Sequence, residues 1–550
     1  MKIKYEKLIL DCFRKFDLKP RDNQLSLVND IVVAYIDEKK EYVVLSAPTG
    51  TGKSIVAVIV AECIAKLTDV PAPSSYILMS TNTLTKQYRE SFSKYGNAFV
   101  TVKGANNYGC AVLQDTAEHC IMKELKGVNR LKCDACEFKE LKERKYKASH
   151  FITNYSYYFI SAMYNQQFQQ RQIAVFDEAH LINDTFSNHM ALKLTMSNLK
   201  FWKSRMNTFQ TEGFDGFAPR IDKFSSALHT GRVTLSNYGT YIEAMKQLCE
   251  EIIAEYEEQA KRYFGANNMK AYTSYAKIIK MFKSISGNIF EVQTQKNEYA
   301  IDIQDNGLII TPIFVGSMFK RLRTTDYSLF MSATIDASFI SQTLRIPRSD
   351  IKFIKSSPVF KQESKSVAFL KHGSYNYKNL NNPAFVNQVG NVVADIIKEH
   401  ADVNGIILTS SFKLTEQVAN VIRKRRAGNL VEHERGSLLA DSVHDHKTNG
   451  KPSVLISPSL FEGIDLPDDE SRFQILTKAP YPSLGDKRIR YIFDNYPDIY
   501  ELMTIYKIIQ GLGRSTRNNK DFSMSYALDS NIARLFFSPK NKWKNEFKVV

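Results

Sequence analysis

A glycine-rich stretch between two apolar runs has the residue types of a phosphate-binding loop. The apolar runs cover 42–45 and 55–60, so we expect a buried strand before the loop and a buried helix after it. Glycines let backbone N–H groups turn onto phosphate oxygens with no Cβ in the way, a lysine reaches the β and γ phosphates, and a hydroxyl holds Mg²⁺. The pattern, with an alanine where a glycine is usual, predicts a nucleoside-triphosphate site at Ala47, Pro48, Thr49, Gly50, Thr51, Gly52, Lys53 and Ser54.

Two acids after another apolar run supply the chemistry that a phosphate loop lacks. The run covers 173–176, and Asp177 and Glu178 follow it directly. A buried strand would carry both carboxylates at its C-terminal end, where Asp177 can hold Mg²⁺ through water and Glu178 can orient or deprotonate the attacking water. The tetrapeptide Asp-Glu-Ala-His at 177–180 can occur by chance, but its position after the phosphate loop favours a hydrolytic site.

A motif near the C-terminus, at 510–517, supplies cationic groups. Arg514 and Arg517 would face the same way on a helix, because residues three apart are neighbours on its surface. Two guanidinium groups placed like this suit a phosphate site completed from another domain, although a basic surface helix would look the same.

Near the N-terminus, Gln24 has the paired donor and acceptor that can read an adenine edge, and an ordinary surface glutamine is the alternative.

Four cysteines lie close together between the phosphate loop and the two acids. Four thiolates suit a structural Zn²⁺ or an iron–sulfur cluster, and in a reducing compartment they indicate metal rather than disulfides. A zinc ribbon has two C-x₂-C knuckles and this segment has one, so the spacing leaves zinc and iron–sulfur equally open. The candidate ligands are Cys110, Cys120, Cys133 and Cys136. The remaining thiols lie in apolar or helical patterns and are expected in cores: Cys12, Cys63 and Cys249.

Two α/β patterns, separated by a helical stretch, must position these residues. The stretch at 190–305 is rich in Lys, Glu and aromatic residues, and its apolar residues between 241 and 256 follow the period of an amphipathic helix that we expect to pack in a core. The second α/β pattern begins near 345 and has no phosphate loop. Its strands are expected at 366–370, 405–409, 453–457 and 473–477. The residues from 540 onwards are expected to form a short basic tail.

The overall charge and hydropathy bound the class of partner. The 550-residue chain carries a formal net charge of +16, which favours an acidic partner such as nucleic acid, although a solvated basic surface is the alternative. No run of about 18 apolar residues predicts a membrane span, and the N-terminus lacks a signal-peptide pattern. We therefore expect a cytoplasmic protein with no membrane partner.

At 80–83, small polar residues end a strand and open a helix, where Thr81 and Asn82 can hold a backbone phosphate or simply cap the helix.

Taken together, these motifs resemble those of the XPD/DinG-type iron–sulfur DNA helicases of superfamily two. The resemblance runs from residue 24 to residue 529. Its most discriminating part is the run 103–110, Lys-Gly-Ala-Asn-Asn-Tyr-Gly-Cys, which resembles the family's approach to its first cluster cysteine. The other matching segments are 47–54 (Walker A), 177–180 (DEAH), 331–334 (motif III), 461–467 (motif V), 478–482 and 510–517 (motif VI).

The resemblance implies an α/β fold with two RecA-like parallel-sheet motor domains, the first interrupted by an iron–sulfur cluster domain and a helical arch domain. The implied boundaries are motor domain 1 at 1–103, 151–190 and 306–345, the cluster insertion at 104–150, the arch at 191–305, and motor domain 2 at 346–550. The implied cofactors are ATP, Mg²⁺ and a 4Fe–4S cluster on the four cysteines, which the resemblance favours over zinc.

The resemblance also implies the activity. The implied activity is that of an ATP-dependent DNA helicase of the compact DinG type. Such a helicase translocates 5′ to 3′ on single-stranded DNA. It acts at single/double-strand junctions, on duplex DNA or on R-loop RNA–DNA hybrids. The family acts in DNA repair and replication, and a monomer is expected. Gln24 would contact adenine, Gln510 with the two arginines would complete the site, and Gly463 with Asp465 would couple motor domain 2 to nucleotide and DNA. The residues expected to contact DNA are Thr81, Asn82, Asn154 and Tyr155.

The chain departs from the family pattern in several places, and two other functions stay open. The arch is small, the segment at 408–412 is less aromatic than usual, and Ser530-Asn531 follows Asp529 where an arginine is common two places on. No nuclease motif is present. One alternative is a motor of the same class directed at RNA. The other is an ATP-gated nucleic-acid-binding scaffold without processive unwinding, which the retained Glu178 and the two arginines argue against.

Overall fold

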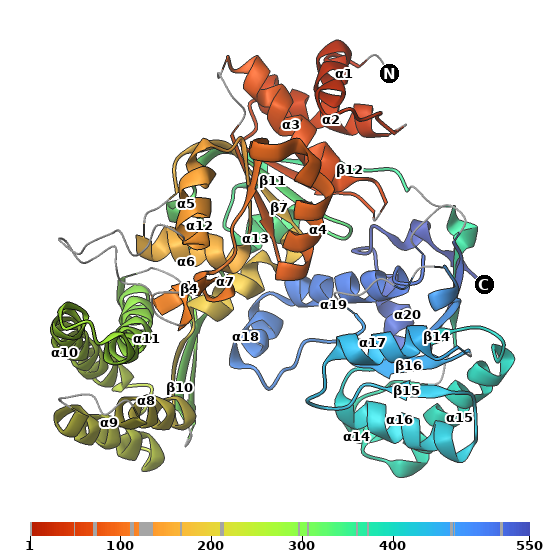
Figure 1. The fold of residues 1–550 in the computed structure, drawn as a ribbon. Helices are drawn as coiled ribbons and strands as arrows, with labels where there is room; N and C mark the ends of the chain where they lie inside the picture. The colour runs from red at the N-terminus through yellow and green to blue at the C-terminus, as the bar shows by residue number, and fades with distance from the viewer. Residues whose placement is uncertain are drawn as a thin grey trace.

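The described residues form two parallel seven-stranded sheets and two smaller antiparallel sheets, with helices packed around them, in a computed structural model (Figure 1). The structure describes residues 3–21, 23–48, 50–69, 74–110, 115–119, 136–165, 168–208, 214–294, 298–304, 307–358, 361–370, 373–450, 452–461, 466, 468–516 and 521–550. The predicted α/β class with two parallel-sheet domains is confirmed.

Domain 1 is built on the sheet with the order β12-β1-β11-β7-β2-β6-β3. Its strands are β1 (Tyr42–Ser46), β2 (Ser75–Met79), β3 (Phe99–Thr101), β6 (His150–Asn154), β7 (Arg171–Asp177), β11 (Thr325–Ser332) and β12 (Ile351–Lys355). All pairings are parallel, and β1, β2 and β7 are buried along their whole length, which explains why they read as continuous apolar runs.

Helices cover both faces of this sheet, because alternate strand residues point to opposite sides. Val43 and Leu45 pack in one core with α1 (Glu6–Lys15), α2 (Gln24–Ile36), α3 (Lys53–Leu67) and α4 (Asn82–Phe92). Val44 packs in the other core. That core includes α6 (Tyr155–Asn165), α7 (Ile182–Met190), α12 (Gly316–Leu322) and α13 (Ala337–Thr343).

The arch insertion, β8 through β10, combines four helices with a three-stranded antiparallel sheet of order β8-β10-β9. Its elements are β8 (Leu192–Thr195), α8 (Met196–Thr208), α9 (Phe214–His229), α10 (Tyr238–Gly265), α11 (Met269–Thr294), β9 (Tyr299–Gln304) and β10 (Gly307–Pro312). The amphipathic helix is present as α10, with Met245, Leu248, Ile252 and Tyr256 buried in the core as expected. The small sheet was not predicted, and β10 joins it rather than the sheet of domain 1.

The cysteine segment is described only in part. It contains β4 (Gly109–Cys110), β5 (Asp115–Thr116) and α5 (Glu137–Lys147). Residues 120–135 lie outside the described residues, and they include Cys120 and Cys133.

Domain 2 is built on the second parallel sheet, of order β15-β16-β14-β17-β18-β13-β19. Its strands are β13 (Lys365–Phe369), β14 (Gly405–Leu408), β15 (Leu430–Glu432), β16 (Val454–Ser457), β17 (Phe473–Leu476), β18 (Ser523–Ala527) and β19 (Lys548–Val549). Its helices are α14 (Tyr377–Leu380), α15 (Pro383–Glu399), α16 (Phe412–Lys424), α17 (Leu439–Thr448), α18 (Lys487–Asn495), α19 (Pro497–Leu512) and α20 (Ser530–Phe536). The four strands expected from the sequence are present within one or two residues of their bounds.

Two segments lie elsewhere than the sequence indicates. The second α/β pattern was expected from 346, but β12 at 351–355 pairs with β1 and completes the sheet of domain 1. The C-terminal residues do not form a free tail, because β19 pairs with β13. Local patterns cannot reveal either pairing, since both partners are distant in sequence.

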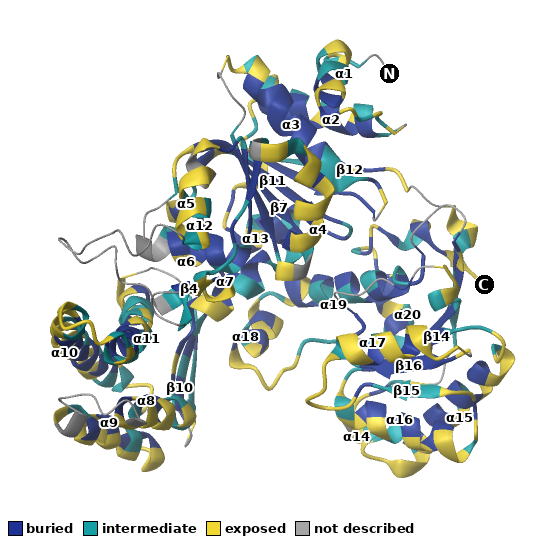
Figure 2. Cartoon of the chain, viewed as in Figure 1, coloured by how far each residue is buried: buried dark blue, intermediate teal, exposed yellow. Residues whose placement is uncertain are grey.

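Burial follows the layered architecture (Figure 2). The central strands β1, β2 and β7 of the first sheet and β14, β16 and β17 of the second are buried along their length, while α4 and α17 turn exposed residues outward. Among the described helices, none combines the length and apolar character that crossing a membrane requires.

Candidate nucleotide site between the two domains

The phosphate loop joins the end of β1 to the start of α3, as predicted. Gly50 and Gly52 have φ angles of 85° and 76°, in the left-handed region that glycine tolerates. A Cβ on Gly52 would lie 2.4 Å from Gln24 Nε2, so a side chain there would displace the Gln24 amide. Lys53 Nζ donates to the Ala47 carbonyl at 3.0 Å, folding the lysine back over the loop. Thr49 lies outside the described residues.

Gln24 is buried against the loop rather than exposed. Its Nε2 donates to the Thr51 carbonyl at 2.9 Å, and its Oε1 accepts from the Arg21 N–H at 3.0 Å. Thr51 in turn donates its hydroxyl to the Pro48 carbonyl at 2.8 Å. Both polar atoms of the Gln24 amide therefore have partners in the chain, and in this structure the residue braces the loop. The surface-glutamine alternative is wrong.

The two acids lie at the C-terminal end of β7, as predicted. Asp177 is the last residue of β7, and Glu178 follows with a left-handed φ of 54°. Tyr88, on α4, donates its hydroxyl to Asp177 Oδ2 at 3.1 Å, a contact that no sequence motif indicates. Burial raises the pKa of Tyr88, the Asp177 charge adds to this, and a hydrogen bond with Ser54 opposes it. Ser54 and Asp177 thus both lie beside one tyrosine hydroxyl.

The two carboxylates differ in their affinity for a proton. Burial raises the pKa of Asp177 to about 6, the neighbouring Glu178 charge adds to the shift, and Lys53 opposes it. Burial would also raise the pKa of Glu178, but Lys53 and His180 outweigh it, so the pKa of Glu178 is lowered. Glu178 therefore stays ionised and can accept a hydrogen bond from water at neutral pH.

A chain of hydrogen bonds runs from Glu178 to domain 2. Ser332, at the end of β11, donates its hydroxyl to Glu178 Oε2 at 3.1 Å, and its Oγ lies 2.9 Å from His180 Nδ1. Gln510, on α19, places Nε2 at 3.0 Å from His180 Nε2 and 3.1 Å from Thr334 Oγ1. The set is satisfied when the His180 proton is on Nδ1, because Nε2 can then accept from Gln510. The amide of domain 2 is thereby connected to the acid pair of domain 1.

The arginine motif is placed differently from the prediction. The expectation that both arginines lie on a helix is wrong for Arg514, because α19 ends at Leu512 and Gly513 caps it. Arg514 donates Nη2 to the Phe461 carbonyl, and its charge is among the influences that lower the pKa of Glu178. Arg517, Gly463 and Asp465 lie outside the described residues.

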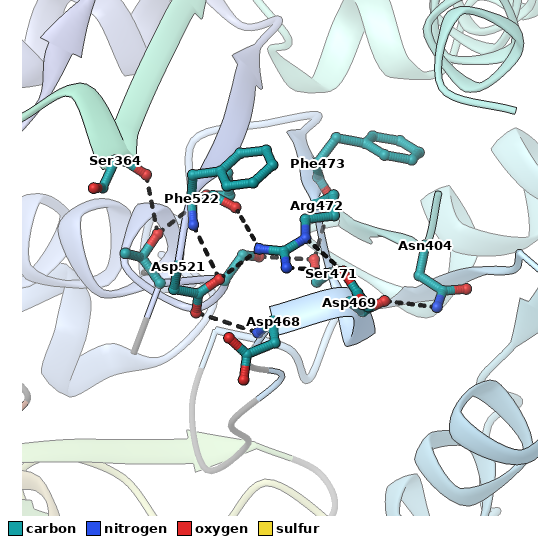
Figure 3. A network of polar contacts seen from close by, with 12 residues as sticks. Ser364, Asn404, Asp468, Asp469, Ser471, Arg472, Phe473, Asp521 and Phe522 are labelled. Carbon is teal, nitrogen blue, oxygen red and sulfur yellow. Dashed lines mark hydrogen bonds and ion pairs between the residues drawn. The ribbon is translucent and has the colours of Figure 1, made fainter. Parts of the chain in front are cut away.

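An ion-pair network joins the segment that follows Gly463 and Asp465 to the segment that follows Arg517 (Figure 3). Asp521, which is 1% exposed, accepts from Arg472 Nη1 at 2.8 Å and from the Asp468 N–H at 3.2 Å. Arg472 also reaches Asp469 Oδ1 at 2.8 Å and lies over the Phe522 ring at 4.5 Å. Arg472 and Asp521 precede the neighbouring parallel strands β17 and β18. Once the order of the strands is known, the sequence indicates that these two residues lie near each other.

The residues expected to contact nucleic acid are divided by the structure. Asn82 and Asn154 lie side by side and share a hydrogen bond of 2.6 Å. Thr81 is exposed and caps α4 by accepting from the Leu84 N–H at 3.2 Å, so its ordinary capping role is observed. Tyr155 is fully buried and donates its hydroxyl to the Asp177 carbonyl. A direct contact of Tyr155 with DNA is therefore corrected to a contact that supports the acid strand.

The cysteines separate into core thiols and candidate ligands. Cys12 and Cys63 are buried, with their sulfurs 3.6 Å apart, and Cys249 is buried in the arch insertion, as expected. Cys110 is half-buried in β4, and Cys136 is the N-cap of α5. Within the described ranges, no three metal-ligating side chains gather at one point.

Comparisons with known proteins place the fold. Residues 17–210 match the family model of the type III restriction enzyme res subunit, and residues 394–542 match that of the helicase C-terminal domain. No curated protein sequence matches the chain. The protein has the two-domain architecture of the RecA-like helicases.

Three solved structures share this fold over nearly the whole chain. An XPD helicase structure has 15% identity and a TM-score of 0.67, covering 97% of this chain and 99% of its own. A structure named XPD_APO has 14% identity and a TM-score of 0.61, with coverages of 96% and 99%. Xpd4 of S. tokodaii has 13% identity and a TM-score of 0.60, with coverages of 96% and 100%. The fold is thus that of XPD-type helicases.

Proposed function

We propose that the protein is an ATP-dependent helicase of the DEAH type that translocates on single-stranded DNA and unwinds duplex DNA or RNA–DNA hybrids. The observation that carries the proposal is the hydrogen-bond chain from Glu178 through Ser332 and His180 to Gln510. It connects the phosphate side of domain 1 to a helix of domain 2. A motor needs such a connection, because hydrolysis in one domain must change the position of the other.

In the proposed mechanism, the chain holds and neutralises the phosphates. The loop N–H groups and Lys53 bind the β and γ phosphates, and Glu178 orients the attacking water. Arg514 and Arg517 neutralise the charge that develops on the transferred group. Asp177 and Ser54 would hold Mg²⁺, and their common position beside the Tyr88 hydroxyl fits this role. Mg²⁺ held there would supply positive charge that offsets the negative charge of the phosphates.

Nucleic acid as the partner is supported by the net charge of the chain and by the position of two asparagines. The net charge of +16 suits a polyanion, and Asn82 and Asn154 lie together at the C-terminal ends of the neighbouring strands β2 and β6. The preference for DNA and the 5′ to 3′ direction rest on the family resemblance. A role in DNA repair or replication rests on the same ground.

We also propose a 4Fe–4S cluster on Cys110, Cys120, Cys133 and Cys136. The two described cysteines fit as ligands, because both are partly exposed, unlike the buried thiols of the cores. The protein would supply the ligands and a fixed domain around the cluster.

The test compares unwinding by the intact protein and by Lys53→Ala. We expect ATP-driven unwinding of a 5′-tailed DNA duplex, and a loss of about a thousandfold in DNA-stimulated ATP hydrolysis for Lys53→Ala, since the lysine is the main cation on the transferred phosphate. Lys66→Ala, an exposed residue of the same helix, is the control.

Matched 3′-tailed, RNA and hybrid substrates decide direction and substrate. Unwinding of RNA alone would replace the DNA proposal with an RNA motor. Tight ATP-dependent binding without strand displacement would identify a scaffold. Wild-type turnover in Lys53→Ala would contradict the site itself.

A further inference from the structure

The last residues of the chain are bound to both domains. Trp543 is 1% exposed and is among the largest fully buried side chains. On the domain 2 side, β19 pairs with β13, and Asn541 Nδ2 donates to the Phe536 carbonyl in α20 at 2.8 Å. We call Asn541–Val550 the C-terminal strap. Its sequence is basic, yet its tryptophan is a core residue.

Trp543 also reaches the base of the phosphate loop in domain 1. Its indole Nε1 donates to Ser46 Oγ at 2.9 Å, and Ser46 Oγ lies 3.3 Å from the Ala333 carbonyl, to which it donates. Ser46 is the last residue of β1 and directly precedes Ala47. The strap is therefore hydrogen-bonded to the residue from which the phosphate loop departs.

A second set of contacts connects the strap to the helix that carries Gln510. The Trp543 indole and the Tyr506 ring meet edge to face, with centroids 5.4 Å apart and planes at 86°. The Tyr506 hydroxyl accepts from the Asp336 N–H at 3.1 Å, and the Asp336 carboxylate forms an ion pair with Lys542. Lys542 thus contacts Asp336 and Trp543 contacts Tyr506, the two partners of one interdomain hydrogen bond.

Tyr506 and Gln510 lie one helical turn apart on α19 and both face domain 1. Residues four apart share a helix face, so a shift of Tyr506 moves Gln510 with it. Gln510 meets His180 and Thr334, while Tyr506 meets Asp336, two residues beyond Thr334. The strap therefore sets the position of α19 against the ends of β1 and β11 at the same time.

We propose that Lys542 and Trp543 are positioning residues that couple the phosphate loop of domain 1 to α19 of domain 2. The proposal rests on the proposed function, since its consequence for turnover requires ATP hydrolysis. The strap acts through Ser46 on the loop and through Tyr506 on Gln510.

The first experiment measures nucleic-acid-stimulated ATP hydrolysis in Trp543→Phe, Ser46→Ala and the double variant. Phenylalanine keeps a ring but removes the indole N–H. We expect kcat to fall about fivefold in each single variant, as for loss of one hydrogen bond, with the ATP dissociation constant changed by less than about twofold. The double variant should lose less than the product of the two single losses, because both changes remove the Trp543–Ser46 bond, while Ser46→Ala also removes the bond to the Ala333 carbonyl.

Trp202→Phe is the matched control, because Trp202 is the other of the chain's two tryptophans and is buried in α8 of the arch insertion. It should leave kcat unchanged within about twofold. Additive losses in the double variant, or an equal loss in Trp202→Phe, would contradict the coupling and indicate general destabilisation.

The second experiment does not depend on activity. Hydrogen exchange of the Asp336 amide in nucleotide-free protein reports the interdomain bond to Tyr506 directly. We expect exchange about tenfold faster in Lys542→Ala and in Trp543→Phe than in the wild type or in Trp202→Phe. Unchanged exchange in both strap variants would overturn the proposal. If the wild type hydrolyses no ATP, the proposed function fails while this measurement still decides the role of the strap.

Discussion

Gln510 joins domain 2 to the acid pair of domain 1 through a single side-chain amide. Its two N–H donors meet His180 Nε2 and Thr334 Oγ1. His180 is connected through Ser332 to Glu178, the candidate for orienting the attacking water. The position of this amide therefore depends on how the two domains lie against each other.

We expect Gln510→Ala to separate turnover from nucleotide binding. Removal of the amide takes away the hydrogen bond that Gln510 donates to His180, so kcat should fall about tenfold while the ATP dissociation constant stays within about twofold. Steady-state hydrolysis and equilibrium binding of an ATP analogue measure the two quantities. Asn495→Ala, at the exposed end of α18, is the control. An equal loss of binding and turnover would mean that Gln510 contributes to nucleotide affinity instead.

At the scale of elements, β4 and α5 hold the described part of the cysteine segment. Cys110 packs against the core of the arch insertion, and Cys136 starts α5, which returns the chain to β6. The segment therefore contacts the arch insertion at one end and rejoins domain 1 at the other. A metal centre here would fix both parts.

Cys110→Ser should remove the proposed cluster. We expect anaerobically purified wild-type protein to contain iron and sulfide and to absorb visible light, and the variant to lose both signals because one thiolate ligand is missing. Cys249→Ser, a buried thiol of the arch insertion, should keep them. Stoichiometric zinc in colourless wild-type protein would favour a structural zinc site.

For the molecule as a whole, buried histidines in both domains set how it responds to acid. His150 in domain 1 is fully buried between Ser75 and Glu62, and burial lowers its pKa although the Glu62 carboxylate opposes this. His446 in domain 2 is buried, and burial again lowers the pKa despite its contact with the Glu470 carbonyl. Both are held in the neutral form by the fold.

The protein should lose stability as pH falls below about 6.5, the ordinary histidine pKa. In that window the unfolded chain binds protons that the folded chain does not, so acid favours unfolding. The midpoint of thermal unfolding should therefore fall between about pH 7 and about pH 5.5, and His446→Gln should reduce the slope. His444→Gln, an exposed residue of the same helix, should not. An unchanged slope in His446→Gln would remove this residue from the explanation.

The sequence by itself determined the chemistry-bearing residues and most of the strands of the two parallel sheets. Gly50 and Gly52 can be recognised in the sequence because a left-handed loop demands glycine locally. The acids at 177–178 can be recognised because a buried parallel strand appears in the sequence as one apolar run. Such signals depend on a few consecutive residues, so a single chain is enough to find them.

Only the tertiary structure decided which of these residues meet. Gln24 turns inward onto the phosphate loop, Tyr155 supports Asp177 from within the core, and α19 ends before Arg514. The return of β12 to the first sheet and the docking of Trp543 also depend on partners far away in the chain. Such contacts are selected by the packing of whole sheets and helices against one another, and no local period records them.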